Sequence, residues 1–232
     1  MRKFIIFFFL IFSFVSKAES IESVLKKVQA VYSSNKMSYK MVYSLYKGHQ
    51  SNIVHSSYQG ELKMKNGQVY QKIKNTEFIY GNEFFLKINS EEKVIVLSKA
   101  NSSFKSDVNI ELPLKECISN VLKDMGSYYS ITLKLNPISS VPCSVIKMRV
   151  DKKKYTILRM DFYYSSLQDF STSYNETDMH QPHLKVEFSD INLSPVINSK
   201  FFELSSYIEI DKTILKPTGV YSPFELLDNR LN

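Results

Sequence analysis

The motifs by which most enzyme active sites are recognised are missing from this sequence. It contains no Gly-x-Ser-x-Gly, His-Glu-x-x-His or Cys-x-x-Cys, so neither a serine nucleophile at a strand-to-helix turn nor a familiar zinc site is indicated. Tryptophan is absent and cysteine occurs twice. The sequence therefore predicts no catalytic residue, no metal site and no cofactor, and we expect a protein that is not an enzyme.

Long apolar runs are missing after residue 18. Before it, Arg2 and Lys3 precede almost continuous Phe, Ile and Leu over residues 4–15, and Ser16-Lys17-Ala18 supplies small residues for cleavage. This run is shorter than the roughly 20 residues that span a bilayer. We interpret residues 1–18 as a secretory signal peptide cut after about Ala18, with a retained anchor as the alternative. No cysteine follows to carry a lipid, so we expect export to the periplasm as a free protein.

A strong excess of charge is also missing from the part that remains. Residues 19–232 carry 27 Lys and Arg against 23 Asp and Glu, a net charge of +4. This small excess argues against a nucleic-acid partner. A chain of 214 residues is predicted to form one domain, and we expect a monomer. The basic triplet of residues 152–154 indicates a solvated hairpin tip, with an anionic membrane surface as the alternative.

The two cysteines, Cys117 and Cys143, leave two readings open. Disulfides persist in exported proteins, so a bond between them is possible. Two thiols that pack as small hydrophobic groups are the equal alternative, because the sequence does not show that the two residues lie close together.

Helical periodicity is confined to two segments. Ser20 can cap a helix of about three turns that ends near Asn35, with one apolar stripe formed by Ile21, Val24, Leu25, Val28, Val31 and Tyr32. Residues 112–126 form the second segment, in which Pro113 suits the first turn and Gly126 suits the end. One face of that predicted helix carries Leu114, Cys117, Ile118, Val121, Leu122 and Met125.

Elsewhere the apolar period is two, which is typical of strands with one wet face. The predicted strands lie at 37–45, 58–64, 69–73, 84–88, 94–97, 131–135, 146–150, 158–164, 184–188, 201–204 and 207–210, and Asn66-Gly67 indicates a hairpin. Residues 94–97 are apolar on both sides, which is typical of a fully buried strand. The predicted fold class is mainly β (α+β): a large curved antiparallel sheet or incomplete β-barrel of about 9–11 strands. An N-terminal helix and an inserted helical lid complete it.

The apolar faces of these strands are rich in methionine and aromatic residues. Methionine is flexible and polarisable, so surfaces rich in it adapt to irregular apolar partners. An ordinary core padded with these residues is the simpler interpretation. A sheet with only two helices can, however, leave part of its apolar face uncovered, and such a face would bind a ligand.

One polar stretch gathers possible metal ligands, namely Glu176, Asp178, His180 and His183. Its spacing fits no named site, and Pro182 resists the helix that would place both imidazoles on one face. We interpret the stretch as a polar loop before a strand, with an unrecognised hydrolase site as the alternative.

The order of these parts resembles the family of the outer-membrane lipoprotein carrier LolA. Residues 58–64, Tyr-Gln-Gly-Glu-Leu-Lys-Met, are similar to the family's Gly-x-Leu strand, and Phe188, Ile191-Asn192 and Phe201-Phe202 to its closing hydrophobic, Asn, Phe pattern. The family's aromatic-x-Tyr-Asp segment is missing, since Phe84-Phe85-Leu86 leads into Lys87. The resemblance implies an incomplete barrel with helices that cover an apolar, acyl-binding cavity in the periplasm, and it carries over no functional residue.

The leading hypothesis is a periplasmic carrier that binds a lipid or lipoprotein acyl chain without covalent chemistry. A membrane-associated donor or acceptor protein would be its further partner. A sensor or protein-docking module of the same fold is the alternative. The residues predicted to line the ligand site are Met41, Tyr43, Leu45, Leu62, Met64, Met148, Leu158, Met160, Phe162 and Phe188 on the wall, with Ile118, Val121, Leu122 and Met125 on the lid.

Overall fold

The computed structural model describes residues 19–100, 111–173, 175–211 and 214–230. The predicted signal peptide, residues 1–18, lies outside the described part of the chain. Within that part, no helix combines the length and the apolar character that crossing a membrane requires.

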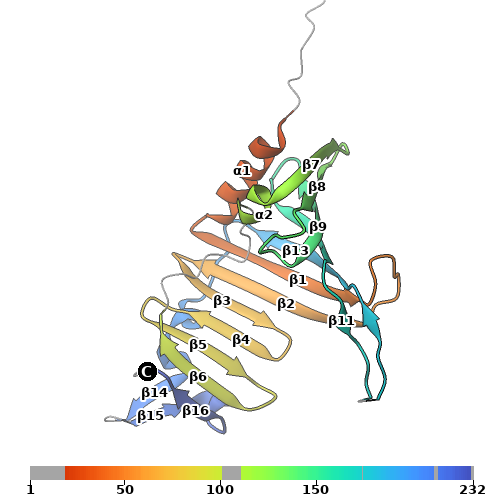
Figure 1. Cartoon of the computed structure of the whole chain (residues 1–232). Helices are drawn as coiled ribbons and strands as arrows, with labels where there is room; N and C mark the ends of the chain where they lie inside the picture. Colours follow the sequence, from red (N-terminus) through yellow and green to blue (C-terminus); the bar gives the residue numbers. More distant parts are fainter. Residues whose placement is uncertain (1–18, 101–110, 174, 212–213, 231–232) are drawn as a thin grey trace, which may run out of the picture.

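One sheet of 12 strands dominates the structure and has the order β16-β6-β5-β4-β3-β2-β1-β13-β10-β9-β8-β7 (Figure 1). Its strands are β1 (Lys36–Tyr46), β2 (Ser56–Lys65), β3 (Gln68–Ile73), β4 (Thr76–Tyr80), β5 (Phe84–Asn89), β6 (Val94–Lys99), β7 (Cys117–Asp124), β8 (Tyr128–Leu135), β9 (Cys143–Asp151), β10 (Ile157–Tyr164), β13 (His183–Asn192) and β16 (Glu225–Asp228). Neighbours are antiparallel, except that β16 runs parallel to β6. The predicted class, mainly β with an open sheet, is confirmed.

The smaller elements surround this sheet. They are the helices α1 (Ile21–Tyr32) and α2 (Glu111–Lys115), the strand pair β11 (Gln168–Asp169) with β12 (Met179–His180), the strand pair β14 (Ile208–Asp211) with β15 (Ile214–Pro217), and the 3-10 turns η1 (Ser199–Phe202), η2 (Leu204–Ser206) and η3 (Gly219–Tyr221). In Figure 1, α1 lies beside β7 and β8, whereas β14, β15 and β16 lie next to β6 at the opposite end of the sheet.

The N-terminal helix forms as its sequence predicts. Ser20 is the N-cap, and its hydroxyl accepts a hydrogen bond of 3.2 Å from the backbone N–H of Ser23. Such a cap satisfies one of the free donors of the first turn. Of the predicted stripe, Val31 is half buried and the other positions are buried, namely Ile21, Val24, Leu25, Val28 and Tyr32. The stripe is therefore the surface by which α1 packs on the sheet.

The predicted helical lid at residues 112–126 is wrong. Only the short α2 is helical, and the chain then forms β7, which pairs antiparallel with β8. Gly126, with φ of +85°, serves the hairpin turn instead of ending a helix. Pairing with β8 satisfies the backbone groups on one side of this segment, and such a tertiary contact outweighs a local helical pattern.

The possible disulfide is not formed, because the structure holds both cysteines as free thiols. Cys117 pairs with Leu135 of β8, while Cys143 lies at the start of β9. One strand thus separates them, and positions two strands apart are about 10 Å from each other. A disulfide requires Cα atoms within about 7 Å. Cys143 is buried, which raises the pKa of its thiol to about 11.

The sheet carries a hydrophobic core on each face, in different halves. We call the face that shows Met37, Tyr39 and Met41 the inner face, and the face that shows Ser38 and Lys40 the outer face. On the inner face, α1 buries one cluster against β1, β2 and β8 to β10. On the outer face, the C-terminal residues Phe202, Tyr207 and Ile208 bury a second cluster on β3 to β6, made of Tyr70, Ile79, Leu86, Ile88, Ile95 and Leu97.

Candidate functional site: the inner face of the sheet

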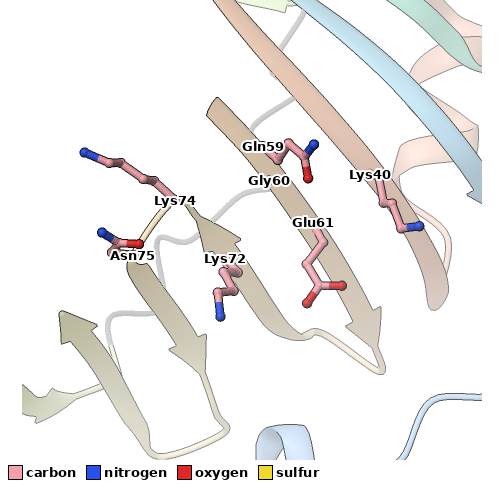
Figure 2. Close-up of a pocket in the computed structure, with 7 residues that line it drawn as sticks. All are labelled: Lys40, Gln59, Gly60, Glu61, Lys72, Lys74 and Asn75. Carbon is pink, nitrogen blue, oxygen red and sulfur yellow. The ribbon is translucent and has the colours of Figure 1, made fainter. Parts of the chain in front are cut away.

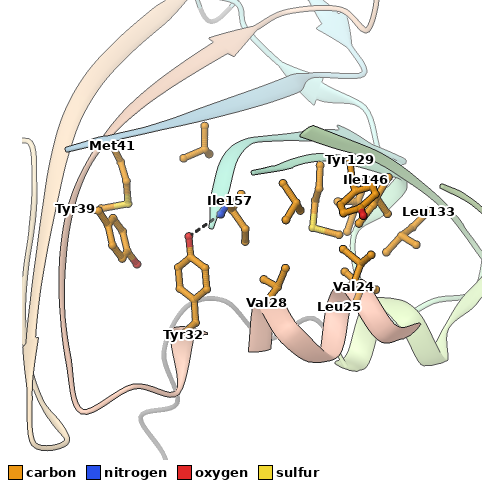
Figure 3. Close-up of a cluster of buried hydrophobic side chains, with 14 of the residues drawn as sticks. Val24, Leu25, Val28, Tyr32, Tyr39, Met41, Tyr129, Leu133, Ile146 and Ile157 are labelled. Carbon is orange, nitrogen blue, oxygen red and sulfur yellow. Dashed lines mark hydrogen bonds between the residues drawn. The ribbon is translucent and has the colours of Figure 1, made fainter. Parts of the chain in front are cut away.

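The helix α1 covers one part of the inner face of the sheet. Figure 3 shows Val24, Leu25 and Val28 directed into a cluster that includes Tyr129, Leu133 and Ile146. At the end of the helix, the hydroxyl of Tyr32 accepts a 3.1 Å hydrogen bond from the backbone N–H of Ile157. Burial raises the pKa of Tyr32 to about 12. This part of the face is a packed core.

Next to this core the inner face carries a band of apolar side chains that are only half buried. We call this band the apolar rim, and it consists of Tyr43, Leu45, Tyr58, Met160, Phe162 and Leu184. Strand register places them together: Tyr43 is opposite Tyr58, Leu45 is opposite Leu184, and Leu184 is opposite Phe162. The rings of Tyr43 and Tyr58 stack with centroids 5.0 Å apart. The rim offers partly exposed apolar surface beside a methionine-rich core.

Gly60 lets the rim pack closely. A Cβ atom at this position would lie 3.0 Å from the carbonyl oxygen of Lys72 and 3.1 Å from Cε2 of Tyr43. Both distances are tighter than ordinary van der Waals contact, and one partner is backbone that cannot swing away. The missing side chain therefore allows the ring of Tyr43 to approach Gly60 closely.

The predicted lining residues fall into three groups. Four lie deep in the core, with exposed fractions of 4% for Met41, 3% for Leu62, 9% for Met64 and 1% for Met148. Half-buried positions are Tyr43, Leu45, Leu122, Leu158, Met160, Phe162 and Phe188. Ile118, Val121 and Met125 are exposed, at 56%, 48% and 51%. Since the lid helix does not exist, these three form no inner lid surface.

A second group on the inner face escaped the sequence analysis. Tyr80 and Phe85 lie opposite each other on β4 and β5, with ring centroids 4.7 Å apart, and Phe78 stacks on Phe85 at 6.5 Å. All three are half buried. The rim residues Tyr58 and Leu184 were also missed as lining residues. They continue the same two-residue period as Leu62 and Val186, which is the signal that could have identified them.

The outer face of the other half is polar and contains a buried ionic network. Nε and a terminal nitrogen of Arg159 donate to the Asp161 carboxylate at 2.7 and 2.5 Å, and Nε2 of His183 lies 2.9 Å from it. Burial alone would raise the pKa of Asp161, but the hydrogen bonds from His183 and Arg159 outweigh it and hold that pKa below its usual value. Tyr163 and Tyr46 stack on the His183 ring, with centroids 4.4 and 5.1 Å away.

The possible metal ligands between Glu176 and His183 lie in different environments. His180 is exposed and lies 2.7 Å from a carboxylate oxygen of Asp178, which also pairs with Lys47. His183 belongs instead to the buried network with Asp161. In the described part of the chain, no three His, Cys, Asp or Glu side chains are close enough together to hold a metal ion.

A hollow of about 310 Å³ lies on the outer face and is lined mostly by polar and charged residues. Its lining is Lys40, Gln59, Gly60, Glu61, Lys72, Lys74 and Asn75. Figure 2 shows the lysine side chains extending in different directions. Lys40 also pairs with Asp190 at 2.8 Å and Lys72 with Glu77 at 3.5 Å. The ammonium groups of these lysines therefore do not converge on one point in the hollow.

Comparison with known proteins finds similarity to solved structures alone. No protein-family model matches the chain, and no curated protein matches it. Among solved structures it is similar to a LolA superfamily protein from Nitrosomonas europaea (13% identity, 82% of this chain and 100% of that chain covered, TM-score 0.28). It is also similar to the lipoprotein LppX from Mycobacterium tuberculosis (12%, 77% and 99%, 0.42), and to MucB in complex with MucA (8%, 87% and 63%, 0.38).

A LolA superfamily protein is thus among the solved structures to which the chain is similar. Identities of 8–13% and TM-scores below 0.5 assign neither cargo nor mechanism to this chain.

Proposed function

We propose that the protein is an exported, single-domain carrier that binds the acyl chain of a lipid or lipoprotein on its inner face, without covalent chemistry. The observation that carries the proposal is the apolar rim, where six aromatic and aliphatic side chains are left half buried beside the core. Solvated apolar surface of this kind gains free energy when a ligand covers it. The predicted signal peptide supports a periplasmic location.

Binding would rest on burial of the ligand's methylene groups. Each methylene moved from water to an apolar surface contributes roughly 0.8 kcal/mol, so a long acyl chain needs no specific polar contact. Met160 of the rim and Met41 beneath it can adjust to an irregular ligand, because methionine side chains have several easily rotated bonds. Ligand release would require only that an acceptor offer a better apolar surface.

Rim substitutions test this proposal. Phe162→Ser and Leu45→Ser should each weaken the binding of a fluorescent fatty acid by roughly tenfold, because a large part of a side-chain contact worth about 1.5–3 kcal/mol is lost. Binding is measured by titration, with circular dichroism as the check on folding. Val42→Ser is the matched control, since Val42 lies on β1 next to Tyr43 but on the outer face.

Two results would contradict the carrier function. One is a folded wild-type protein that takes up no fatty acid. The other is uptake that Val42→Ser weakens as much as the rim substitutions. Copurification of a lipid-free protein with one specific partner protein would instead support a docking module.

A further inference from the structure

The hairpins β7–β8 and β8–β9 concentrate the positive charge of the molecule. Residues 117–154 contain seven Lys and Arg and two Asp, which gives this segment a net charge of +5. The net charge of residues 19–232 is only +4, so the rest of the chain is slightly negative. Lys123, Lys134, Lys147 and Arg149 are all exposed, and strand register puts them on the outer face together with Val121.

The β7–β8 and β9–β10 turns lie at the same end of these strands, where they bring the basic triplet next to the exposed Met125. The backbone N–H of Lys152 donates to the carbonyl oxygen of Ser127 at 3.1 Å, so the β9–β10 turn lies against the β7–β8 turn. Met125 lies in the latter turn and is 51% exposed, and Ile118 and Val121 on β7 are 56% and 48% exposed. We call this surface the basic edge, defined by Ile118, Val121, Lys123, Met125, Lys134, Lys147, Arg149, Lys152, Lys153 and Lys154.

The acidic groups within this segment are already engaged. Asp124 pairs with Lys152. The carboxylate of Asp151 accepts backbone hydrogen bonds from Lys153 at 2.9 Å and Lys154 at 2.7 Å. The latter bonds fix the turn while the two ammonium groups stay exposed. Lys152 is therefore paired with Asp124, and the segment as a whole keeps its net charge of +5.

Cations mixed with exposed apolar side chains and an interfacial tyrosine are typical of surfaces that bind anionic membranes. Phospholipid headgroups attract each nearby Lys or Arg, and shallow insertion of apolar side chains adds to that attraction. Arg149 also lies over the ring of Tyr128, 5.6 Å from its centroid, and tyrosine is enriched at the membrane interface. An acidic protein would match the charge, but it would not by itself account for Ile118, Val121 and Met125.

We infer that the basic edge docks the protein on an anionic phospholipid membrane. This inference is independent of acyl-chain binding, because the edge lies on β7 to β9 and their turns, whereas the apolar rim lies on β1, β2, β10 and β13. Each lost charge should reduce membrane binding about fivefold, so removal of three should reduce it roughly 100-fold.

Vesicle cosedimentation tests the inference with the exported protein, purified without detergent. The wild type should bind phosphatidylcholine vesicles that contain phosphatidylglycerol, should leave them at high salt, and should not bind pure phosphatidylcholine. The triple variant K152Q/K153Q/K154Q should lose roughly 100-fold in affinity. The control variant K93Q/K99Q/K200Q has the same net charge, but its three exposed lysines lie outside the edge, so it should bind like the wild type.

A second pair of variants separates insertion from simple charge attraction. Ile118→Ser and Met125→Ser should weaken binding at low salt although they leave the net charge unchanged, because they remove apolar contacts that salt does not screen. The inference is overturned if the wild type ignores anionic vesicles, if both lysine triples weaken binding equally, or if only an acidic protein binds the edge. Failure to bind fatty acids would leave it standing and would contradict only the carrier function.

Discussion

At the scale of single residues, Asp161 is a buried carboxylate that depends on two hydrogen-bonding partners. Its side chain is 7% exposed and is shared between Arg159 and His183. Removal of one partner from a buried ionic network leaves the other charges without compensation, and this usually costs more than the network contributes. The network therefore matters for the stability of β10 and β13, the two strands that carry much of the apolar rim.

The contribution of Asp161 to stability depends on pH. The folded-state pKa of Asp161 is held below its usual value of 3.8, so its carboxylate stabilises the fold at neutral pH. That contribution is lost as the pH falls below the usual value toward the folded-state pKa. Asp161→Asn should lower the free energy of unfolding by about 2–4 kcal/mol at pH 7. The difference from the wild type should shrink in acid, as measured by urea unfolding.

Asp190→Asn is the control for this prediction. Asp190 pairs with Lys40, but both side chains are 64% exposed, and such surface pairs contribute about 0–1 kcal/mol. An Asp161→Asn effect that stayed constant down to the lowest pH would contradict the role assigned to the carboxylate.

Residue roles could be predicted from the sequence only in part. The two-residue period correctly put Met41, Tyr43, Leu62 and Phe162 on one face of the sheet. It did not separate the buried Met41 from the half-buried Tyr43, because that difference depends on how much of the face α1 covers. The partnership of Asp161 with His183 spans 22 positions in the sequence, and no local pattern signals it.

At the scale of elements, β7 shows how a local pattern can mislead. Its apolar positions fit a helix, yet only Cys117 and Leu122 pack against the core. In contrast, α1 was predicted correctly because its cap and stripe agree with its tertiary contacts. The five-residue strand β4 was missed because it is short and lies between two turns.

A pair of substitutions distinguishes the strand from the helix. In the predicted helix, Val121 and Leu122 would share the buried face, whereas in β7 they point to opposite faces. Leu122→Ser should therefore lower the free energy of unfolding by about 1–3 kcal/mol, while Val121→Ser should change it by less than about 0.5 kcal/mol. Thermal or urea unfolding provides the measurement. Equal destabilisation by both changes would favour the helix.

At the scale of the whole molecule, two cores share one sheet. α1 closes the inner face in one half and the C-terminal segment closes the outer face in the other, so each half keeps one face uncovered by those segments. The inner face is apolar and aromatic at the rim beside the α1 cluster and again at Tyr80 and Phe85 on β4 and β5, whereas the outer face of the α1 half is charged. This division would allow an acyl chain to be held on one face while the other approaches a membrane.

The open β architecture could be predicted from periodicity and hairpin signals, but the sheet order could not. The placement of β13 beside β1 and the parallel pairing of β16 with β6 join segments far apart in the chain. Such pairings depend on tertiary contacts and not on local sequence. The C-terminal cover of the second core was consequently not anticipated.

Photo-crosslinking with a diazirine-labelled fatty acid tests the central claim, binding on the inner face, most directly. The exported protein is labelled, digested and analysed by mass spectrometry. We predict labels on rim residues of β1, β2, β10 and β13, and loss of those labels when unlabelled fatty acid competes. Labels confined to the C-terminal core or to β7, or an absence of competable labels in a folded protein, would contradict the account.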